Sequence, residues 1–266
     1  MTIFWFVDAD FKIERILFCI SEYTFNMKII ILSLISGLST VLGSLVLFIN
    51  RKYKDKLLSF CFGLASSVMF LVSIFELIPE SINYAFNSFS MPILFLVSLG
   101  LLMSGGGVVY LLDKYSKSDN ELYNIGFLCM LSILVHNIPE GIITSLSLLS
   151  NYDFGLKMLF IIMIHNIPEG ISIAAPIYYS GQSKIKSLLF SFISGGGEVL
   201  GAILGLTIFR FFNIDLLMYF LLMITAGIMV YLSIGKLFIK GIKLTEDNYF
   251  ILGIIIGIII LIITLW

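Results

Sequence analysis

The chain has 266 residues, of which 59% are hydrophobic and 12% charged, with a net charge of −1 and a mean hydropathy of +1.06. A soluble domain usually carries about 25% charged residues, and a chain this rich in Leu, Ile and Phe is not disordered. The net charge gives no basic surface for nucleic acid. The three cysteines, Cys19, Cys61 and Cys129, are too far apart to suggest a disulfide framework or a thiolate cluster. The composition indicates an all-α polytopic membrane protein.

Eight apolar stretches follow one another, each near or above the ~20 residues that a helix needs to cross a bilayer. The connections are short and carry most of the charge, so residues 27–266 are expected to form one eight-helix domain in the cell (inner or plasma) membrane. The predicted spans are Lys28–Ile49, Leu57–Glu80, Met91–Leu112, Asn124–Leu149, Phe154–Tyr179, Ile185–Phe212, Asp215–Phe238 and Tyr249–Trp266.

The basic residues predict the orientation of these spans. Eleven of the sixteen Lys and Arg residues lie in the connections after the first, third, fifth and seventh spans. Cytoplasmic loops carry such an excess, so both termini are expected outside the cytoplasm. Residues 1–26 lack the order of a secretory signal. They are interpreted either as an extension from an upstream start codon or as an interfacial segment.

Five of the seventeen acidic residues and both histidines lie inside the apolar spans. One charged residue at the centre of a membrane helix costs about 2.5–3.5 kcal/mol, so five lipid-facing acids would cost on the order of 13–17 kcal/mol. These side chains are therefore expected to face one another, water or a cation. They are Glu76, Glu80, Glu140, Glu169, Glu198, His136 and His165.

The fourth and fifth spans share a seven-residue motif, His-Asn-Ile-Pro-Glu-Gly-Ile, which begins at His136 and again at His165. In each copy the histidine and the glutamate are four residues apart, hence on one helix face and one turn apart. If the two spans pack face to face, His136 and Glu140 would meet His165 and Glu169. A structural hydrogen bond would explain a single His–Glu pair, but it explains a duplicated motif less well.

Other polar groups could add to this cluster. The proline of each motif is expected to kink its helix and free carbonyl oxygens, and the amides of Asn137 and Asn166 offer further oxygen atoms. Kinked helices at corresponding positions of a repeat commonly mark transport sites. A looser copy of the motif ends the second span at Glu76 and Glu80. Glu80 lies at the end of the span, so its side chain is either part of the site or simply solvated. Three glycines before Glu198 would let the sixth span approach closely.

Imidazole and carboxylate donors suit Zn²⁺, Fe²⁺ or Mn²⁺, and the lack of placed thiolates argues against Cu⁺. Five carboxylates could balance the charge of two divalent ions. Because metal and protons compete for the same atoms, metal binding should release protons and uptake should depend on pH. The sequence thus predicts a divalent-metal transporter rather than an enzyme, without a prosthetic group, and leaves channel-like and carrier-like transport open.

Two other function classes compete with this hypothesis. An intramembrane metal hydrolase would use similar ligands to activate water, but the His-Glu-x-x-His motif of many zinc proteases is missing. A proton- or sodium-coupled carrier of an organic solute would keep its activity after chelation. Metal flux into proteoliposomes separates these classes, because a hydrolase would show cleavage without accumulation.

The tandem motif, the Glu-x-x-Pro pattern of the second span and the Gly-rich stretch before Glu198 resemble the ZIP (Zrt/Irt-like protein) metal transporters, in particular their bacterial ZupT-type branch. The resemblance implies uptake of Zn²⁺, Fe²⁺, Mn²⁺ or Cd²⁺ into the cytoplasm, a homodimer, and a two-metal centre bridged by Glu140 and Glu169. The binding positions that it implies are His136, Asn137, Glu140, His165, Asn166, Glu169, Glu198 and Glu76.

Two features depart from the family pattern. The connection Asp113–Tyr123 contains no histidine, although many relatives have a His-rich loop there. A metal-sensing role of this loop is therefore not expected. Near the end of the seventh span, where ZupT-like members tend to be acidic, this chain has Lys236, which argues against a metal contact on the exit side.

Overall fold

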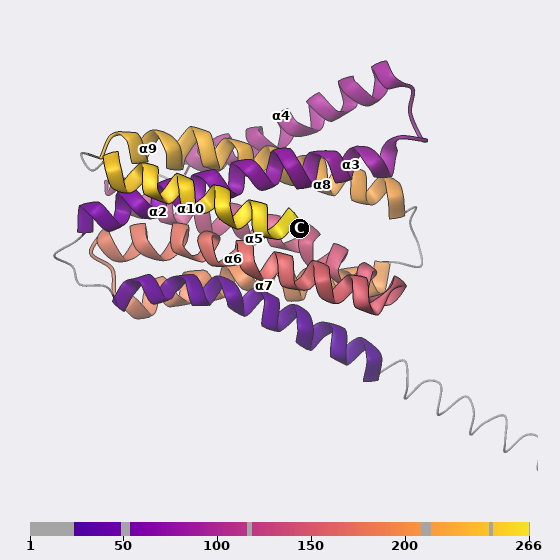
Figure 1. The fold of residues 1–266 in the computed structure, drawn as a ribbon, viewed down its shortest axis with the longest axis horizontal. Coiled ribbons are helices and arrows are strands. Elements are labelled where there is room, and N and C mark those ends of the chain that lie inside the picture. The colour runs from indigo at the N-terminus through magenta and orange to yellow at the C-terminus, as the bar shows by residue number, and fades with distance from the viewer. Residues whose placement is uncertain (1–23, 49–53, 116–118, 209–213, 245–246, 266) are drawn as a thin grey trace, which may run out of the picture.

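The structure, a computed structural model, describes residues 24–48, 54–115, 119–208, 214–244 and 247–265, and the regular elements in these ranges are all helices (Figure 1). Within these ranges, seven helices are long and apolar enough to cross a membrane, and an eighth apolar helix, Asn248–Thr264, is shorter. The prediction of an all-α polytopic membrane protein is confirmed. Of the predicted N-terminal extension, residues 1–26, the first 23 residues lie outside the part of the chain that the structure describes.

The helices run back and forth along the long axis of the molecule (Figure 1). The first described helix, Thr24–Phe48, is called helix 24–48 here and ends in the 3₁₀ turn η1 (Ser44–Phe48). The other elements are α2 (Lys54–Val72), η3 (Ser73–Leu77), α3 (Ile78–Ala85), α4 (Met91–Tyr115), α5 (Glu121–Ser150), α6 (Tyr152–Tyr179), α7 (Lys184–Ile208), α8 (Ile214–Leu232), η4 (Ser233–Phe238), α9 (Ile239–Ile242) and α10 (Asp247–Leu265).

The two helices that carry the tandem motif begin at asparagine caps. The side-chain oxygen of Asn120 accepts a hydrogen bond from the Tyr123 amide at 3.2 Å, and that of Asn151 accepts one from the Phe154 amide at 3.1 Å. Such caps satisfy backbone donors that have no partner at a helix start. α5 and α6 then continue through Pro139 and Pro168, so each motif lies inside one unbroken helix.

Two spans contain a π-helical turn that the sequence does not reveal. The predicted second span, Leu57–Glu80, begins at Lys54, passes through η3 and extends to Ala85. The predicted seventh span, Asp215–Phe238, passes through η4 and extends to Ile242. A π turn inserts one residue and rotates the side chains that follow it, and such turns are frequent at functional sites. Glu76 lies in the first of them and Lys236 in the second.

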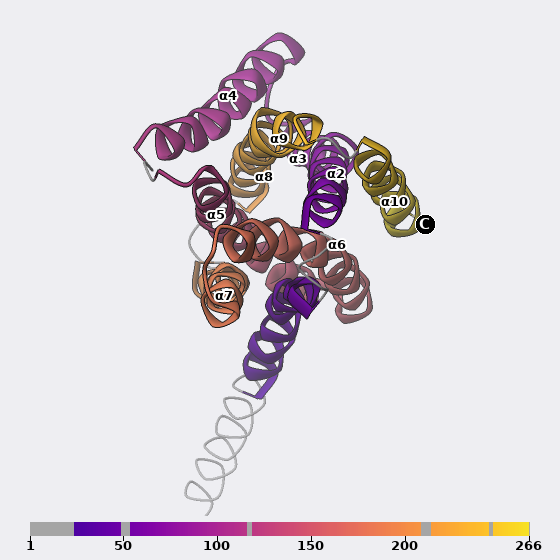
Figure 2. The same ribbon diagram turned by 90° about the vertical axis from the view of Figure 1, so that its left-hand side faces the viewer.

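Glycines pack two groups of helices closely (Figure 2), and Gly105 and Gly227 do the same between α4 and α8. In the first group, a Cβ atom at Gly37 would overlap the backbone of Gly195, and one at Gly201 would overlap the Ile138 carbonyl, so helix 24–48, α5 and α7 touch along their backbones. α6 joins this group through Gly170, which lies against helix 24–48. In the second group, Gly63 brings α2 against α10 in the same way. Small residues permit such backbone contacts between membrane helices.

One end of the helix bundle is basic, and we call it the basic end. α2, α5, α7 and α10 begin there, and α4, α6 and α9 end there (Figure 1). Lys236 on η4 contacts Asp113 of α4 at 2.5 Å, and Lys240 on α9 contacts Glu121 of α5 at 2.5 Å. Lys236 is therefore engaged with a carboxylate of α4.

Candidate metal site

The two copies of the tandem motif meet in the interior of the first helix group. The carboxylate oxygen Oε1 of Glu140 lies 3.0 Å from Nε2 of His136 and 3.0 Å from Nε2 of His165. The same nitrogen of His136 lies 3.3 Å from Oε1 of Glu169. All four side chains are at most 4% exposed. The structure thus brings together the imidazole–carboxylate pairs of α5 and α6, with Glu140 between the two rings.

The asparagines of the motif tie the site to its two neighbouring helices. Nδ2 of Asn137 donates to the Ser194 carbonyl of α7 at 3.0 Å. Nδ2 of Asn166 donates to the Ser36 carbonyl of helix 24–48 at 3.3 Å and to Oε1 of Glu198. The buried Oδ1 atoms of both asparagines have no hydrogen-bond partner. With their NH₂ groups engaged, these carbonyl oxygens remain available as metal ligands.

Glu198 enters the site from α7 and is fully buried. Its Oε1 accepts from Asn166, and its Oε2 has no hydrogen-bond partner. A Cβ atom at Gly197 would lie 2.5 Å from the Leu134 carbonyl, so α7 approaches α5 closely at this point. The glycines before Glu198 therefore place its carboxylate beside the two motifs, as the sequence suggests.

Glu76 and Glu80 lie apart from this buried cluster, on the wall of a cavity. Glu76 in η3 is partly buried, and its Oε1 accepts a hydrogen bond from Thr264 of α10 at 3.2 Å. Glu80 on α3 is exposed. Both line a cavity of about 330 Å³ that Glu140 and His165 also line. The cavity is bordered by α3 and the start of α6, so it opens toward the end opposite the basic end.

Several buried polar atoms at the site have no hydrogen-bond partner. Among them are Oε2 of Glu140, Oε2 of Glu169 and Oε2 of Glu198. Leaving buried polar or charged atoms unpaired is costly, so these oxygens require a cation or a proton. Among the described residues, no group of three or more His, Cys, Asp or Glu side chains is arranged to hold a metal ion as it stands. The rings and carboxylates contact one another and must separate to admit one.

Sequence reasoning missed the contribution of helix 24–48. The hydroxyls of Ser33, Ser36 and Thr40 are buried without a hydrogen-bond partner, and the Ser36 carbonyl receives Asn166. The signal was present, because these three residues are three and four positions apart and so lie on one helix face. Hydroxyls spaced in this way in an apolar span indicate a face turned toward other helices.

Comparison with known proteins places the chain in a family. The sequence profile described as ZIP zinc transporter matches residues 113–264. The zinc transporter ZupT of Chlorobium limicola is 34% identical over 85% of this chain and 92% of its own length. The proteins of the same name from Clostridium perfringens and Campylobacter jejuni are 30% and 31% identical, over 88% and 92% of this chain and 94% and 98% of their own lengths. This chain belongs to the ZIP zinc transporter family.

Proposed function

We propose that this protein takes up divalent metal cations, zinc foremost, across the cell membrane into the cytoplasm through the site between α5 and α6. One observation carries the proposal: Oε1 of Glu140 lies 3.0 Å from an imidazole nitrogen of each motif, in a fully buried setting. Two imidazoles that share one carboxylate offer the mixed nitrogen and oxygen donors that zinc prefers.

The cavity beside the site supplies a route for the ion. It lies between the outer parts of α3 and α6 and reaches Glu140 and His165, while Glu76 and Glu80 stand on its wall. A hydrated cation in the cavity would exchange water for these carboxylates and then for the imidazoles. Binding must be firm enough to replace the hydration shell and weak enough for release. The contacts of Glu140 with both rings would then give way to contacts with the ion.

The site has enough nitrogen and oxygen donors to bind two metal ions. Glu140 and His165 line the cavity, whereas Asn166, Glu169 and Glu198, which carry buried oxygens without a hydrogen-bond partner, are not part of its lining. We propose that Glu140 and Glu169 bridge these two positions, and that Fe²⁺, Mn²⁺ and Cd²⁺ also bind, because they accept the same donors. The number of Zn²⁺ ions bound per chain, measured by mass spectrometry of metal content, tests this: two supports the bridged centre and one contradicts it.

Uptake of radioactive Zn²⁺ into proteoliposomes tests the main proposal. Glu140→Ala and Glu169→Ala should each lower the initial rate at least tenfold. Asp153→Asn, which removes an exposed acid from the first turn of α6, should leave the rate unchanged. Normal uptake by both site variants, with folding intact, would contradict the proposal. Solute transport that persists after chelation would favour an organic-solute carrier, and peptide or ester cleavage without accumulation would favour a hydrolase.

We further propose a homodimer with both termini outside the cytoplasm. The uncovered face of α4 supports the dimer: Phe95 and Met103 are 68% and 69% exposed, while the other face of α4 packs on α8 at Gly105, and α4 lies at the edge of the bundle in Figure 2. The lysines at the basic end support the orientation, because cytoplasmic loops are enriched in Lys and Arg. Cysteine cross-linking through Met103→Cys in membranes tests the dimer contact, and failure to cross-link there would contradict it.

A further inference from the structure

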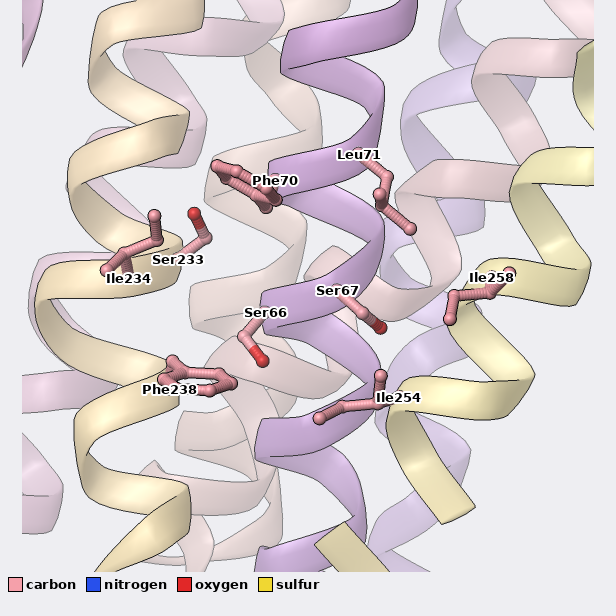
Figure 3. A pocket seen from close by; sticks show the side chains of 9 residues that line it. All are labelled: Ser66, Ser67, Phe70, Leu71, Ser233, Ile234, Phe238, Ile254 and Ile258. Carbon is pink, nitrogen blue, oxygen red and sulfur yellow. The ribbon is translucent and has the colours of Figure 1, made fainter. Parts of the chain in front are cut away.

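A second cavity, of about 280 Å³, lies on the outer wall of the second helix group, away from the metal site (Figure 3). α2 forms its floor, η4 one side and α10 the other. The rim residues Ile234, Phe238 and Ile258 are 45%, 37% and 41% exposed. Its lining shares no residue with the cavity beside Glu140 and His165.

The wall of the cavity is apolar although three serines line it. Ser66 and Ser67 on α2 donate their hydroxyls to the carbonyls of Gly63 and Leu64, at 3.1 and 3.0 Å. Ser233 on η4 donates to the Val230 carbonyl at 3.0 Å. Because each hydroxyl donates its proton to a carbonyl of its own helix, none is left to donate to a polar ligand, and the other side chains that line the cavity are all apolar. A hydrocarbon group is the occupant that fits this lining.

Positive charge lies at the basic end of the same helices. Lys56 lies in the first turn of α2 with its Nζ 5.2 Å from the ring centroid of Tyr249 on α10, and Lys243 follows α9 as an exposed residue. In the described residues 54–56 and 243–244, three side chains are basic and one, that of Asp55, is acidic. From Lys56 to Ser66 is about 15 Å along α2, about half of a ~30 Å hydrocarbon layer. This is the distance from a lipid headgroup to the middle of the bilayer.

We propose that this groove binds one anionic phospholipid, with an acyl chain in the cavity of α2, η4 and α10 and the phosphate beside Lys56 and Lys243. Charge favours a lipid over a second copy of the protein. A two-fold contact in a membrane pairs the same surface of both copies at the same depth. Lys56 and Lys243 would then face the lysines of the second copy, and the like charges would repel each other. A phosphate group instead neutralises them, and lysines beside the membrane attract anionic lipids.

The groove has a fixed shape, as a selective lipid site requires. A Cβ atom at Gly257 of α10 would overlap the Ser67 hydroxyl, and one at Gly63 of α2 would overlap the Phe250 carbonyl. α2 and α10 are therefore held in direct contact along the length of the groove. A preformed cavity loses less entropy on binding than one that must be opened.

Native mass spectrometry of the delipidated full-length protein, titrated with phosphatidylglycerol or with phosphatidylcholine of the same chain lengths, tests the proposal. The wild type should bind phosphatidylglycerol at least about tenfold more tightly than phosphatidylcholine. The double variant Lys56→Gln/Lys243→Gln should bring this ratio near one. The control variant Lys186→Gln should keep the wild-type ratio, because Lys186 lies on α7, over the ring of Tyr123 on α5. Ile234→Trp, which fills the cavity from its exposed rim, should weaken binding of both lipids.

Three results would overturn the proposal. The first is equal binding of the two lipids by the wild type. The second is an unchanged ratio in the double variant whose elution and melting temperature match the wild type. The third is efficient cross-linking of two copies through Ile258→Cys in membranes, since the groove would then hold a second copy.

Discussion

The carbonyl oxygen of Glu198 occupies the space in which residue 141 would otherwise carry a β-carbon, because a Cβ atom built on Gly141 would overlap it. The second motif repeats this relationship with a different partner, since a Cβ atom at Gly170 would overlap the Thr40 carbonyl. The motif glycines thus fix how closely α7 and helix 24–48 approach the site. Asn137 and Asn166 bond the same two helices from one turn earlier.

Gly141→Ala should therefore displace α7 and with it the carboxylate of Glu198. Overpacking of a tight contact typically costs about 1–3 kcal/mol. We expect a lower melting temperature and a Zn²⁺ uptake rate reduced about tenfold. Gly100→Ala is the matched control, because nothing lies within 4 Å of a Cβ atom at Gly100 on α4. Equal melting temperatures and rates for the two variants would show that the contact with Glu198 does not position the site.

The helices could largely be predicted from the sequence because hydropathy and helix length suffice to locate membrane spans. The fourth predicted span, Asn124–Leu149, differs from α5 by a few residues at its ends. The π-helical turns η3 and η4 could not be predicted, because they depend on how each span packs against its neighbours. Their effect is to set the faces on which Glu76 and Lys236 lie.

The centre of the site could be predicted because each motif is local. The spacing of four residues puts His136 and Glu140 on one face, and the repeat implies a partner helix with the same face. The roles of the neighbouring helices could not be predicted, because these roles arise from tertiary packing. Nothing in the motif indicates that the amide of Asn166 donates to Ser36, or that Thr264 of the last helix bonds Glu76.

The cavity beside Glu140 predicts which residues of α5 can be reached from outside the cell. Ser147 lines the cavity, whereas Ser132, on the other side of His136 in the same helix, is 1% exposed and is not part of its lining. Ser147→Cys should react with a membrane-impermeant thiol reagent added outside, and Zn²⁺ should slow the reaction. With Cys19 replaced by serine in every variant, Ser132→Cys should stay unlabelled, as should the buried native Cys61 and Cys129. Labelling of Ser147→Cys from the inside alone would reverse the proposed orientation.

The hydrogen bond between Thr264 and Glu76 predicts a measurable contribution to metal capture. Thr264→Val keeps the shape of the side chain but removes a hydroxyl whose single proton is shared between Oε1 of Glu76, at 3.2 Å, and the Leu261 carbonyl of its own helix, at 2.9 Å. A hydrogen bond of this kind contributes about 1 kcal/mol, so we expect KM for Zn²⁺ to rise about fivefold. Thr207→Val is the control, because Thr207 bonds only carbonyls of its own helix. An unchanged KM for Thr264→Val would exclude Glu76 from metal capture.

The two asparagines of the motif should differ in importance, although the sequence treats them alike. Asn137→Leu removes one hydrogen bond between helices, the one to the Ser194 carbonyl inside α7. Asn166→Leu removes two: the Ser36 carbonyl still accepts from Ser39 Oγ, whereas the charged Glu198 carboxylate loses its amide donor. Each buried acceptor left unpaired costs about 1–3 kcal/mol, and more when it is charged. Asn166→Leu should therefore lower the melting temperature further than Asn137→Leu.

Added metal separates stability from binding in this pair. A ligand that binds only the folded state raises its melting temperature according to its affinity. Wild-type protein should be stabilised by Zn²⁺, and Asn166→Leu should lose most of that stabilisation, because it removes one buried oxygen and frees Glu198 from the position in which it faces the site. The Asn137→Leu variant should keep more of the stabilisation by Zn²⁺. If Zn²⁺ stabilised both variants as strongly as the wild type, the asparagines would hold helices together without binding metal.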